Sequence, residues 1–201
     1  MVKSTRDLHG SVPDQCKIVL LILDMFSDFC FPQGLTAARC AARVAPRIAA
    51  LKSRCRLAGI PSIYVNDSVG RWQSNVDALL KRCLAAQSRG RKIAELLKPG
   101  AEDYFVLKAK HSGFFATPLH TLLSYFGCEH LILTGGTAQQ CVLQTACDAY
   151  VRDYALSIPF DCVISLSAPE QRFARYYFKN VLKADLARSP QINLRAREIL
   201  E

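Results

Sequence analysis

The sequence predicts an α/β fold in which a parallel sheet is covered by helices. Strand-like and helix-like segments alternate along nearly the whole chain, which is typical of parallel sheets. After Lys17, the first strand-like segment is continuously apolar as far as Leu23, as expected of a strand with both faces buried. The chain has 201 residues, of which 50% are hydrophobic, so it can form one sizeable core. We therefore expect a single domain over residues 1–201, with residues 1–16 as an N-terminal extension.

The first half of the chain contains three predicted strands. They are rich in β-branched, aliphatic or aromatic residues and cover residues 17–23, 62–66 and 104–108. A helix over residues 36–58 is indicated by apolar side chains at steps of four, three and four residues, before the stop signals Gly59 and Pro61. Shorter apolar faces predict helical segments around residues 76–83 and 93–97.

The second half of the chain continues the alternation. Thr117 and Pro118 form a helix start, with threonine as N-cap and proline at the first helical position, and Gly127 ends this helix. The later elements are a strand at residues 130–134, a helix at 141–154, a strand at 155–159 and a helix at 170–183. A tight turn at Gly135 and Gly136 separates the fourth strand from the helix that follows it.

The charge of the chain is unevenly distributed, but it predicts no nucleic-acid partner. The formal net charge is +9, and residues 39–110 contain fifteen Lys and Arg against five acidic residues. These charges are interleaved with helical apolar positions, and no nucleic-acid recognition motif accompanies them. A solvated basic face, or one that attracts anionic substrates, explains the excess better.

The nine cysteines predict neither a disulfide framework nor a zinc site. Their number is odd, and no two are spaced as C-x-x-C. The first seventeen residues are mixed and polar, and the apolar run from Ile18 to Leu23 is too short for a signal peptide or a membrane span. We therefore expect a cytoplasmic protein without membrane contact, in which most thiols are packed as small apolar groups.

Three residues with complementary chemistry lie at predicted strand ends, where open parallel sheets bind their ligands. Asp24 follows the first strand, Lys108 ends the third, and Cys141 opens the helix after the fourth. The helix start is expected to lower the pKa of the Cys141 thiol, and partial desolvation to raise the pKa of Asp24. Lys108 would stabilise negative charge. Spacing alone also allows a helix cap, a strand-end lysine and one more buried thiol.

The sequence blocks around these residues form a recognisable pattern. They read IVLLILDMFSDF around Asp24, VLKAKHSGFFATPL around Lys108 and LILTGGTAQQCVLQTACDAYVRDY around Cys141. In this order, over residues 17–190, they resemble the isochorismatase-like cysteine hydrolases, which include nicotinamidases and N-carbamoylsarcosine amidohydrolase. The resemblance implies a three-layer α/β/α sandwich with a six-stranded, mostly parallel, Rossmann-like sheet. It also implies that Asp24, Lys108 and Cys141 form a catalytic triad.

The resemblance further implies how the site around the triad is built. A cis peptide bond between Gly136 and Thr137 would aim the N–H of Thr137, together with that of Cys141, at an oxyanion. Three aromatic residues match positions that line substrate pockets in the family: Phe29, Trp72 and Phe114. His111 is interpreted as structural, because the aspartate and the lysine already supply a base and a cation.

These residues together predict hydrolysis of a small amide, ureido or carbamoyl C–N bond through a thioester intermediate. No cofactor or metal is expected, because residues 66–72 lack the Asp-x-His pair and the histidines with which some members bind a metal ion. Cys141 argues against hydrolysis of isochorismate itself, since those members lack this nucleophile. Phe26 and Ser27 stand where the family usually has Gln and Asn, so the resemblance leaves the hydrogen bonds beside Asp24 undefined.

Two other functions agree less well with the sequence. A non-catalytic binding or scaffolding member of the same fold would engage an anionic partner through its basic stretch, but the complete triad disfavours it. A nucleotide-binding Rossmann domain lacks support, since no glycine-rich phosphate loop follows the first strand. The helix at 170–183 has more aromatic side chains than one buried stripe requires, so we expect a homo-oligomer, a dimer or tetramer, acting on a small-molecule substrate.

Overall fold

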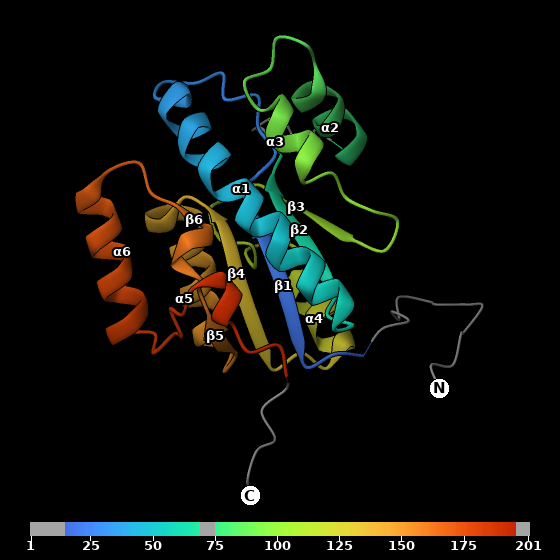
Figure 1. Cartoon of the computed structure of the whole chain (residues 1–201). Coiled ribbons are helices and arrows are strands. Elements are labelled where there is room, and N and C mark those ends of the chain that lie inside the picture. Colours follow the sequence, from blue (N-terminus) through green and yellow to red (C-terminus); the bar gives the residue numbers. More distant parts are fainter. Residues whose placement is uncertain (1–14, 69–74, 196–201) are drawn as a thin grey trace, which may run out of the picture.

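The computed structural model of the protein describes residues 15–68 and 75–195, and Figure 1 shows a central sheet with helices on both of its faces. The strands are β1 (Ile18–Leu23), β2 (Ser62–Asp67), β3 (Tyr104–Lys108), β4 (His130–Gly136), β5 (Ala155–Ser157) and β6 (Val163–Ile164). The α-helices are α1 (Gly34–Leu57), α2 (Val76–Leu84), α3 (Arg91–Leu96), α4 (Leu119–Phe126), α5 (Leu143–Tyr150) and α6 (Ala168–Asn180). A π-helix, η1 (Ala138–Val142), precedes α5, and η2 (Phe160–Cys162) and η3 (Ser189–Gln191) are 3₁₀ turns.

The sheet has the strand order β3-β2-β1-β4-β5, and β6 pairs with β4 beyond the end of β5. Each strand pair in the described part of the chain is parallel. The predicted three-layer α/β fold with a six-stranded sheet is therefore confirmed. The strand order reverses between β1 and β4, and a ligand is expected in the crevice at such a reversal.

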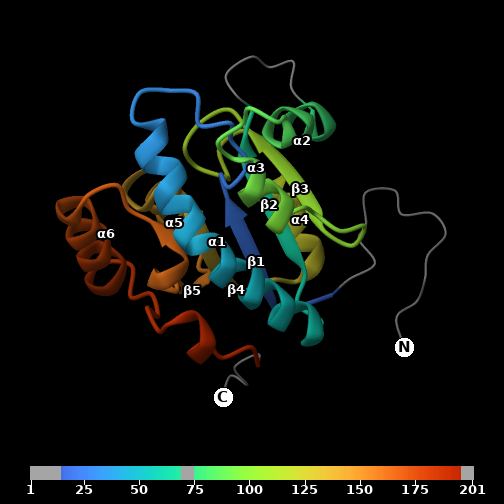
Figure 2. The ribbon, with the colours of Figure 1, turned by 45° about the horizontal axis from the view of Figure 1, so that its top comes forward.

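The alternation of side chains along β1 divides the core into two apolar layers. Ile18, Leu20 and Ile22 face the layer that contains residues of α1, α2 and α3. The intervening residues of β1 face the layer built with α4, α5 and α6. Figure 2 shows α1 running across one face of the sheet. Because both faces are covered, the edge at the strand ends is where polar side chains can gather.

The structure differs from the predicted elements mainly where they are short or capped. β6 has two residues, Val163 and Ile164, too few to show a periodicity in the sequence. The last helix begins earlier than expected, because Ser167 and Glu170 form a capping box at its start. The helix α1 continues through Pro46 without a break.

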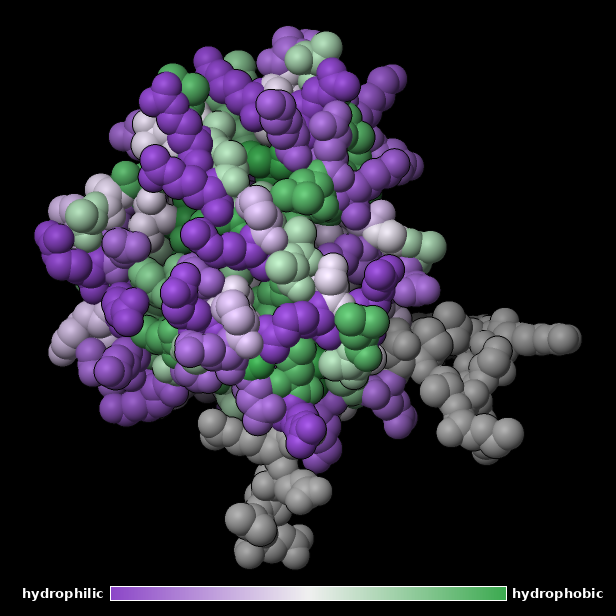
Figure 3. Space-filling view, viewed as in Figure 1, coloured by the Kyte–Doolittle hydropathy of each residue, from purple (hydrophilic) through white to green (hydrophobic). Residues whose placement is uncertain are grey.

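The surface is polar over much of the face shown in Figure 3, with apolar side chains scattered among polar ones. On α6, Phe173 and Tyr176 are exposed, whereas Phe178 is buried in the core. Self-association through these aromatic residues stays a prediction. Within the described ranges, none of the helices has the length and apolar character needed to cross a membrane.

Candidate active site

The turn after β1 fixes the position of the Asp24 carboxylate. Asp24 has a left-handed backbone, with φ of 49°, and its N–H donates to the carbonyl of Val65 in β2 at 3.0 Å. Its Oδ1 accepts the N–H of Asp67 at 2.7 Å. Asn66 binds the backbone of Phe26 twice, since its Oδ1 accepts the N–H and its Nδ2 donates to the carbonyl, both at 2.9 Å. These bonds between neighbouring strand ends hold Asp24 at the edge of the sheet.

The side chain of Lys108 joins Asp24 to Cys141. Lys108 ends β3, and its side chain is 1% exposed. Its Nζ lies 2.8 Å from Oδ2 of Asp24 and 3.4 Å from Sγ of Cys141, and it donates to the carbonyl of Lys110 at 3.2 Å. The structure thus brings together the three residues that the strand ends single out.

A close approach between two strands leads into the cysteine. Gly135 in β4 pairs with Leu23 in β1 and has φ of 99°. A Cβ at this glycine would lie 2.0 Å from the Leu23 carbonyl oxygen, so only glycine fits. The chain then passes through the Gly136–Thr137 peptide bond, which is cis, into η1, where Cys141 lies. The strand pairing therefore places Thr137 and Cys141 beside the end of β1.

Burial and mutual charge shift the pKa values of all three groups. Desolvation raises the pKa of the Asp24 carboxyl, although the Lys108 ammonium opposes this shift. Desolvation and then the charge of Asp24 raise the pKa of the Cys141 thiol to about 12. Burial disfavours the Lys108 ammonium, but the charges of Asp24 and Cys141 outweigh it, so the Lys108 pKa is also raised. The lowered thiol pKa expected at a helix start is therefore wrong, because burial and the charge of Asp24 raise it.

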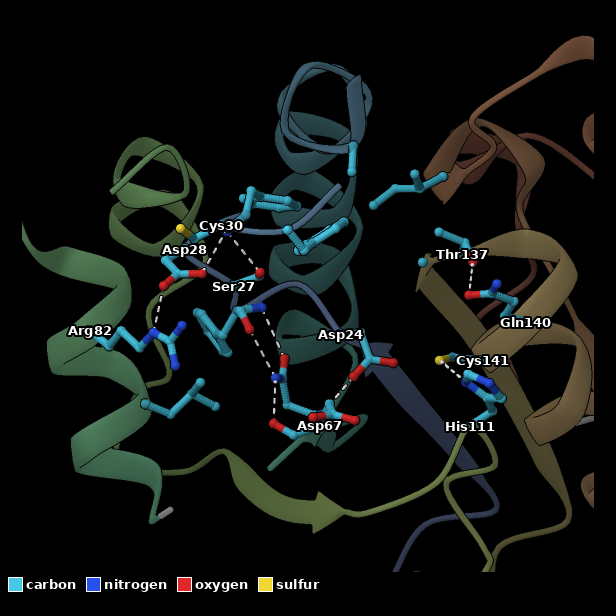
Figure 4. Close-up of a pocket in the computed structure, with 18 residues that line it drawn as sticks. Asp24, Ser27, Asp28, Cys30, Asp67, Arg82, His111, Thr137, Gln140 and Cys141 are labelled. Atoms are coloured by element: carbon cyan, nitrogen blue, oxygen red, sulfur yellow. Dashed lines mark hydrogen bonds and ion pairs between the residues drawn. The ribbon is translucent and has the colours of Figure 1, made fainter. Parts of the chain in front are cut away.

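A pocket of about 390 Å³ opens at this edge of the sheet, a volume typical of small-molecule sites. Figure 4 shows Asp24 and Cys141 pointing toward one another in its wall, with the His111 ring beside the sulfur. Apolar and polar side chains complete the lining: Phe26, Ser27, Asp28, Phe29, Cys30, Phe31, Ala37, Asn66, Asp67, Leu79, Arg82, Gly136, Thr137, Gln140 and Ile164. The pocket therefore combines a polar reactive end with an apolar wall.

The structure separates the three aromatic residues predicted for the pocket. Phe29 lines it. Phe114 is buried in the opposite layer, with its ring centre 6.0 Å from that of Tyr154 and 5.0 Å from the Arg152 guanidinium. Phe114 therefore does not line the pocket, because its side chain packs in the core layer on the other face of the sheet. Trp72 lies outside the described residues.

Phe26 and Ser27, the two departures from the usual family motif, both help to hold the turn after Asp24. The Phe26 ring is buried and lies 5.2 Å from the Tyr64 ring, measured between centroids. The Ser27 hydroxyl accepts the N–H of Phe29 at 2.9 Å. Core packing and short-range hydrogen bonds therefore fix this turn, together with the Asn66 amide that binds the Phe26 backbone.

Sequence analysis missed several residues of the pocket wall. His111 was expected to be structural, but its Nδ1 lies 3.6 Å from Sγ of Cys141, so it is part of the site. Its position three residues after Lys108 was the feature of the sequence that could have indicated a place in the site. Arg82 on α2 and Asp28 form an ion pair with 2.5 Å between Nε and Oδ2. No local pattern could reveal this pair, because its members lie 54 positions apart.

Within residues 15–68 and 75–195, no group of three His, Cys, Asp or Glu is arranged to hold a metal ion. Asn66 and Asp67 line the pocket. The Asn66 amide binds the Phe26 backbone, and the backbone N–H of Asp67 donates to the Asp24 carboxylate.

The region that contains Asp24, Lys108 and Cys141 matches a known sequence family. The isochorismatase domain model matches residues 18–184. The chain belongs to the isochorismatase family. An uncharacterised isochorismatase family protein of Bacillus subtilis is 40% identical over 173 residues, which cover 86% of this chain and 94% of that protein. The family predicted from the three sequence blocks is therefore confirmed.

Two further proteins are similar to this chain. A probable inactive nicotinamidase of Arabidopsis thaliana is 28% identical over 144 residues, covering 67% of this chain and 74% of that protein. The crystal structure of N-carbamoylsarcosine amidase from Thermoplasma acidophilum matches with a TM-score of 0.67 at 26% identity, covering 89% of this chain and 99% of that one. Family membership and these likenesses support a hydrolase.

Proposed function

We propose that this protein is a cysteine hydrolase that cleaves a small amide, ureido or carbamoyl C–N bond through a thioester intermediate. The observation that supports it most directly is the position of Lys108 Nζ, 2.8 Å from Asp24 Oδ2 and 3.4 Å from Cys141 Sγ. A nucleophile, a base and a cation thus meet where the pocket opens. The amidase named among the similar structures supports the same class of bond.

In the first half of the reaction, Asp24 takes the thiol proton of Cys141 and the sulfur attacks a planar carbonyl carbon. The raised pKa values favour the neutral forms of the thiol and of the carboxyl in the resting site. The Lys108 ammonium stabilises the sulfur as it becomes negative. The backbone N–H groups of Thr137 and Cys141 are the proposed donors to the oxyanion.

In the second half, the tetrahedral intermediate expels its nitrogen, and Asp24 returns the proton to the departing ammonia or amine. The acyl group remains on Cys141 as a thioester. Water then hydrolyses the thioester and restores the thiol. The reaction consumes one water molecule and needs no other reactant.

The pocket limits the substrate to a small molecule with an apolar portion. Its volume of about 390 Å³ suits a compact ligand, and Phe29 is proposed to contact the substrate. The apolar wall near Phe26, Leu79 and Ile164 would accept a hydrocarbon group next to the reactive carbonyl. Trp72 remains a proposed contact from the sequence.

A screen of small amides and ureides for ammonia release tests this function. The wild-type protein is expected to release ammonia from at least one compound, and Cys141→Ala is expected to release none, because the nucleophile is absent. Circular dichroism and thermal unfolding show whether the variant keeps the fold. Equal ammonia release by the two proteins would refute the proposed mechanism.

The second candidate function is non-catalytic binding, since one relative is a probable inactive nicotinamidase. In this case no compound in the screen would be turned over, while small ligands would still raise the unfolding temperature of both proteins. The assembled Asp24, Lys108 and Cys141 cluster favours catalysis, because a binding site has no need of a buried thiol between a carboxylate and an ammonium.

A further inference from the structure

His111 brings a fourth ionisable side chain to the sulfur of Cys141. Its Nδ1 lies 3.6 Å from Sγ, and Figure 4 shows the ring beside the thiol. The ring lines the pocket and is exposed to solvent. Within residues 15–68 and 75–195, the imidazole has no second hydrogen-bond partner. An imidazole in this position can exchange a proton with both the sulfur and a water molecule.

The loop that carries His111 is fastened to the helix that follows the nucleophile. The hydroxyl of Ser112 donates to the carboxylate of Asp148, and the N–H of Gly113 donates to the hydroxyl of Thr145 at 2.9 Å. Both acceptors lie on α5, which continues directly from η1. These hydrogen bonds fix the position of the His111 loop relative to the helix that carries Cys141. Proton transfer between the imidazole and the thiol requires such a fixed arrangement.

Asp24 and His111 differ in how they meet solvent. Both carboxylate oxygens of Asp24 are engaged, Oδ1 by the N–H of Asp67 at 2.7 Å and Oδ2 by Lys108 at 2.8 Å. The Asp24 side chain is 17% exposed, whereas His111 belongs to the exposed residues. Both groups line the pocket, and the imidazole is the one that solvent water reaches more readily.

We propose that His111 is a catalytic residue of thioester hydrolysis, an inference that rests on the proposed function. Neutral Nδ1 takes a proton from water while the water oxygen bonds to the thioester carbonyl carbon. The C–S bond then breaks and its electron pair stays on sulfur. The imidazolium returns the proton to Sγ, leaving the acid product and the thiol. Asp24 acts in acylation, and His111 acts in the step that follows.

The test uses p-nitrophenyl acetate, which acetylates a reactive thiol and releases p-nitrophenolate without help from a general acid. In His111→Gln, the first turnover is expected to keep its rate, because Asp24 still activates Cys141. Later turnovers should slow by about a hundredfold, the usual contribution of a general base, and intact-protein mass spectrometry should show acetyl-enzyme accumulating. The matched control is His120→Gln, on α4, whose ring Nδ1 contacts the Tyr154 hydroxyl at 3.2 Å; it should behave like wild type.

A second variant separates a proton-transfer function from a structural one. In His111→Ala, free imidazole added to the isolated acetyl-enzyme should speed its decay and leave the decay of the His120→Gln acetyl-enzyme unchanged. The proposal is overturned if His111→Gln turns over like wild type, or if its first and later turnovers slow equally. Identical p-nitrophenolate release by wild type and Cys141→Ala would instead overturn the proposed function itself, and the His111 proposal with it.

Discussion

Strand β3 has a partly buried lysine–aspartate pair at each end, and the two pairs differ in what surrounds them. At the carboxyl end, Lys108 binds Asp24 and contacts Cys141. At the amino end, Asp103 precedes the strand and binds Lys52 of α1, which also donates to the Tyr64 hydroxyl at 2.9 Å. Each lysine thus bonds to one carboxylate and to one further acidic group, a thiol or a phenol.

The two pairs differ in their further partners. At the amino end, the Tyr64 hydroxyl donates to the Leu97 carbonyl at 2.6 Å, and Asp103 also accepts the N–H of Gly100 at 2.6 Å. This pair lines a hollow of about 310 Å³ that has no cysteine in its wall, whereas Asp24 lines the pocket that contains Cys141. The comparison indicates that an ion pair at the carboxyl end of the strand can take part in the proposed chemistry, while the one at the amino end stabilises the fold.

The largest expected effect comes from breaking the pair beside the pocket. Lys108→Met should lower kcat/KM by about a thousandfold, because the sulfur and the carboxylate lose the cation that stabilises their negative charge. The measurement is steady-state hydrolysis of a substrate found in the screen, or of p-nitrophenyl acetate. Retention of activity within about tenfold of wild type would show that the ammonium is dispensable.

Breaking the other pair should affect folding and spare the chemistry. Lys52→Met leaves Asp103 without its cation, and the two side chains are only 18% and 11% exposed, so the free energy of unfolding should fall by about 2 kcal/mol. Urea denaturation measures this loss, and kcat/KM should match wild type. A Lys52→Met protein of normal stability and reduced activity would reverse the comparison.

The smallest expected effect is a change in alkaline stability caused by the buried thiol. The pKa of Cys141 is raised from 9.0 to about 12, so the fold favours the protonated thiol. This contribution is complete below pH 9 and is lost as pH rises toward 12. Cys141→Ala lacks it, so between about pH 8 and pH 10 its unfolding free energy should fall less than that of wild type, by about 1 kcal/mol. Urea denaturation at several pH values tests this, and parallel curves for the two proteins would contradict it.

The sequence predicted the parts of the site that depend on strand ends. Asp24, Lys108 and Cys141 were found because each follows or ends an apolar strand, and parallel strands bring their carboxyl ends to one edge. The sheet itself followed from the same alternation. The rest depends on tertiary contacts: the Asn66 amide that binds the Phe26 backbone, and the ion pair of Arg82 with Asp28, join segments far apart in sequence.

Two expectations about the site depend on contacts that local sequence does not contain. The Cys141 pKa was expected to be lowered by the helix start, and His111 was expected to be structural because the aspartate and the lysine already supply a base and a cation. Packing puts a carboxylate beside the thiol and an imidazole on its open side. Local sequence shows that a residue lies at a strand end, but it does not show which other strand ends surround it.

The close contact of Gly135 with Leu23 depends on the register of β1 and β4, so the proposed hydrolase activity would depend on this register as well. The site forms only when β1 pairs correctly with β2 and β4, and β2 with β3, since each pairing aligns one of its residues. A slip of one position would turn alternate side chains to the opposite face. A misregistered chain could be compact and keep all nine thiols, yet it would bring no lysine to Cys141. Catalysis would therefore count correctly paired molecules, which a measurement of size or helix content cannot do.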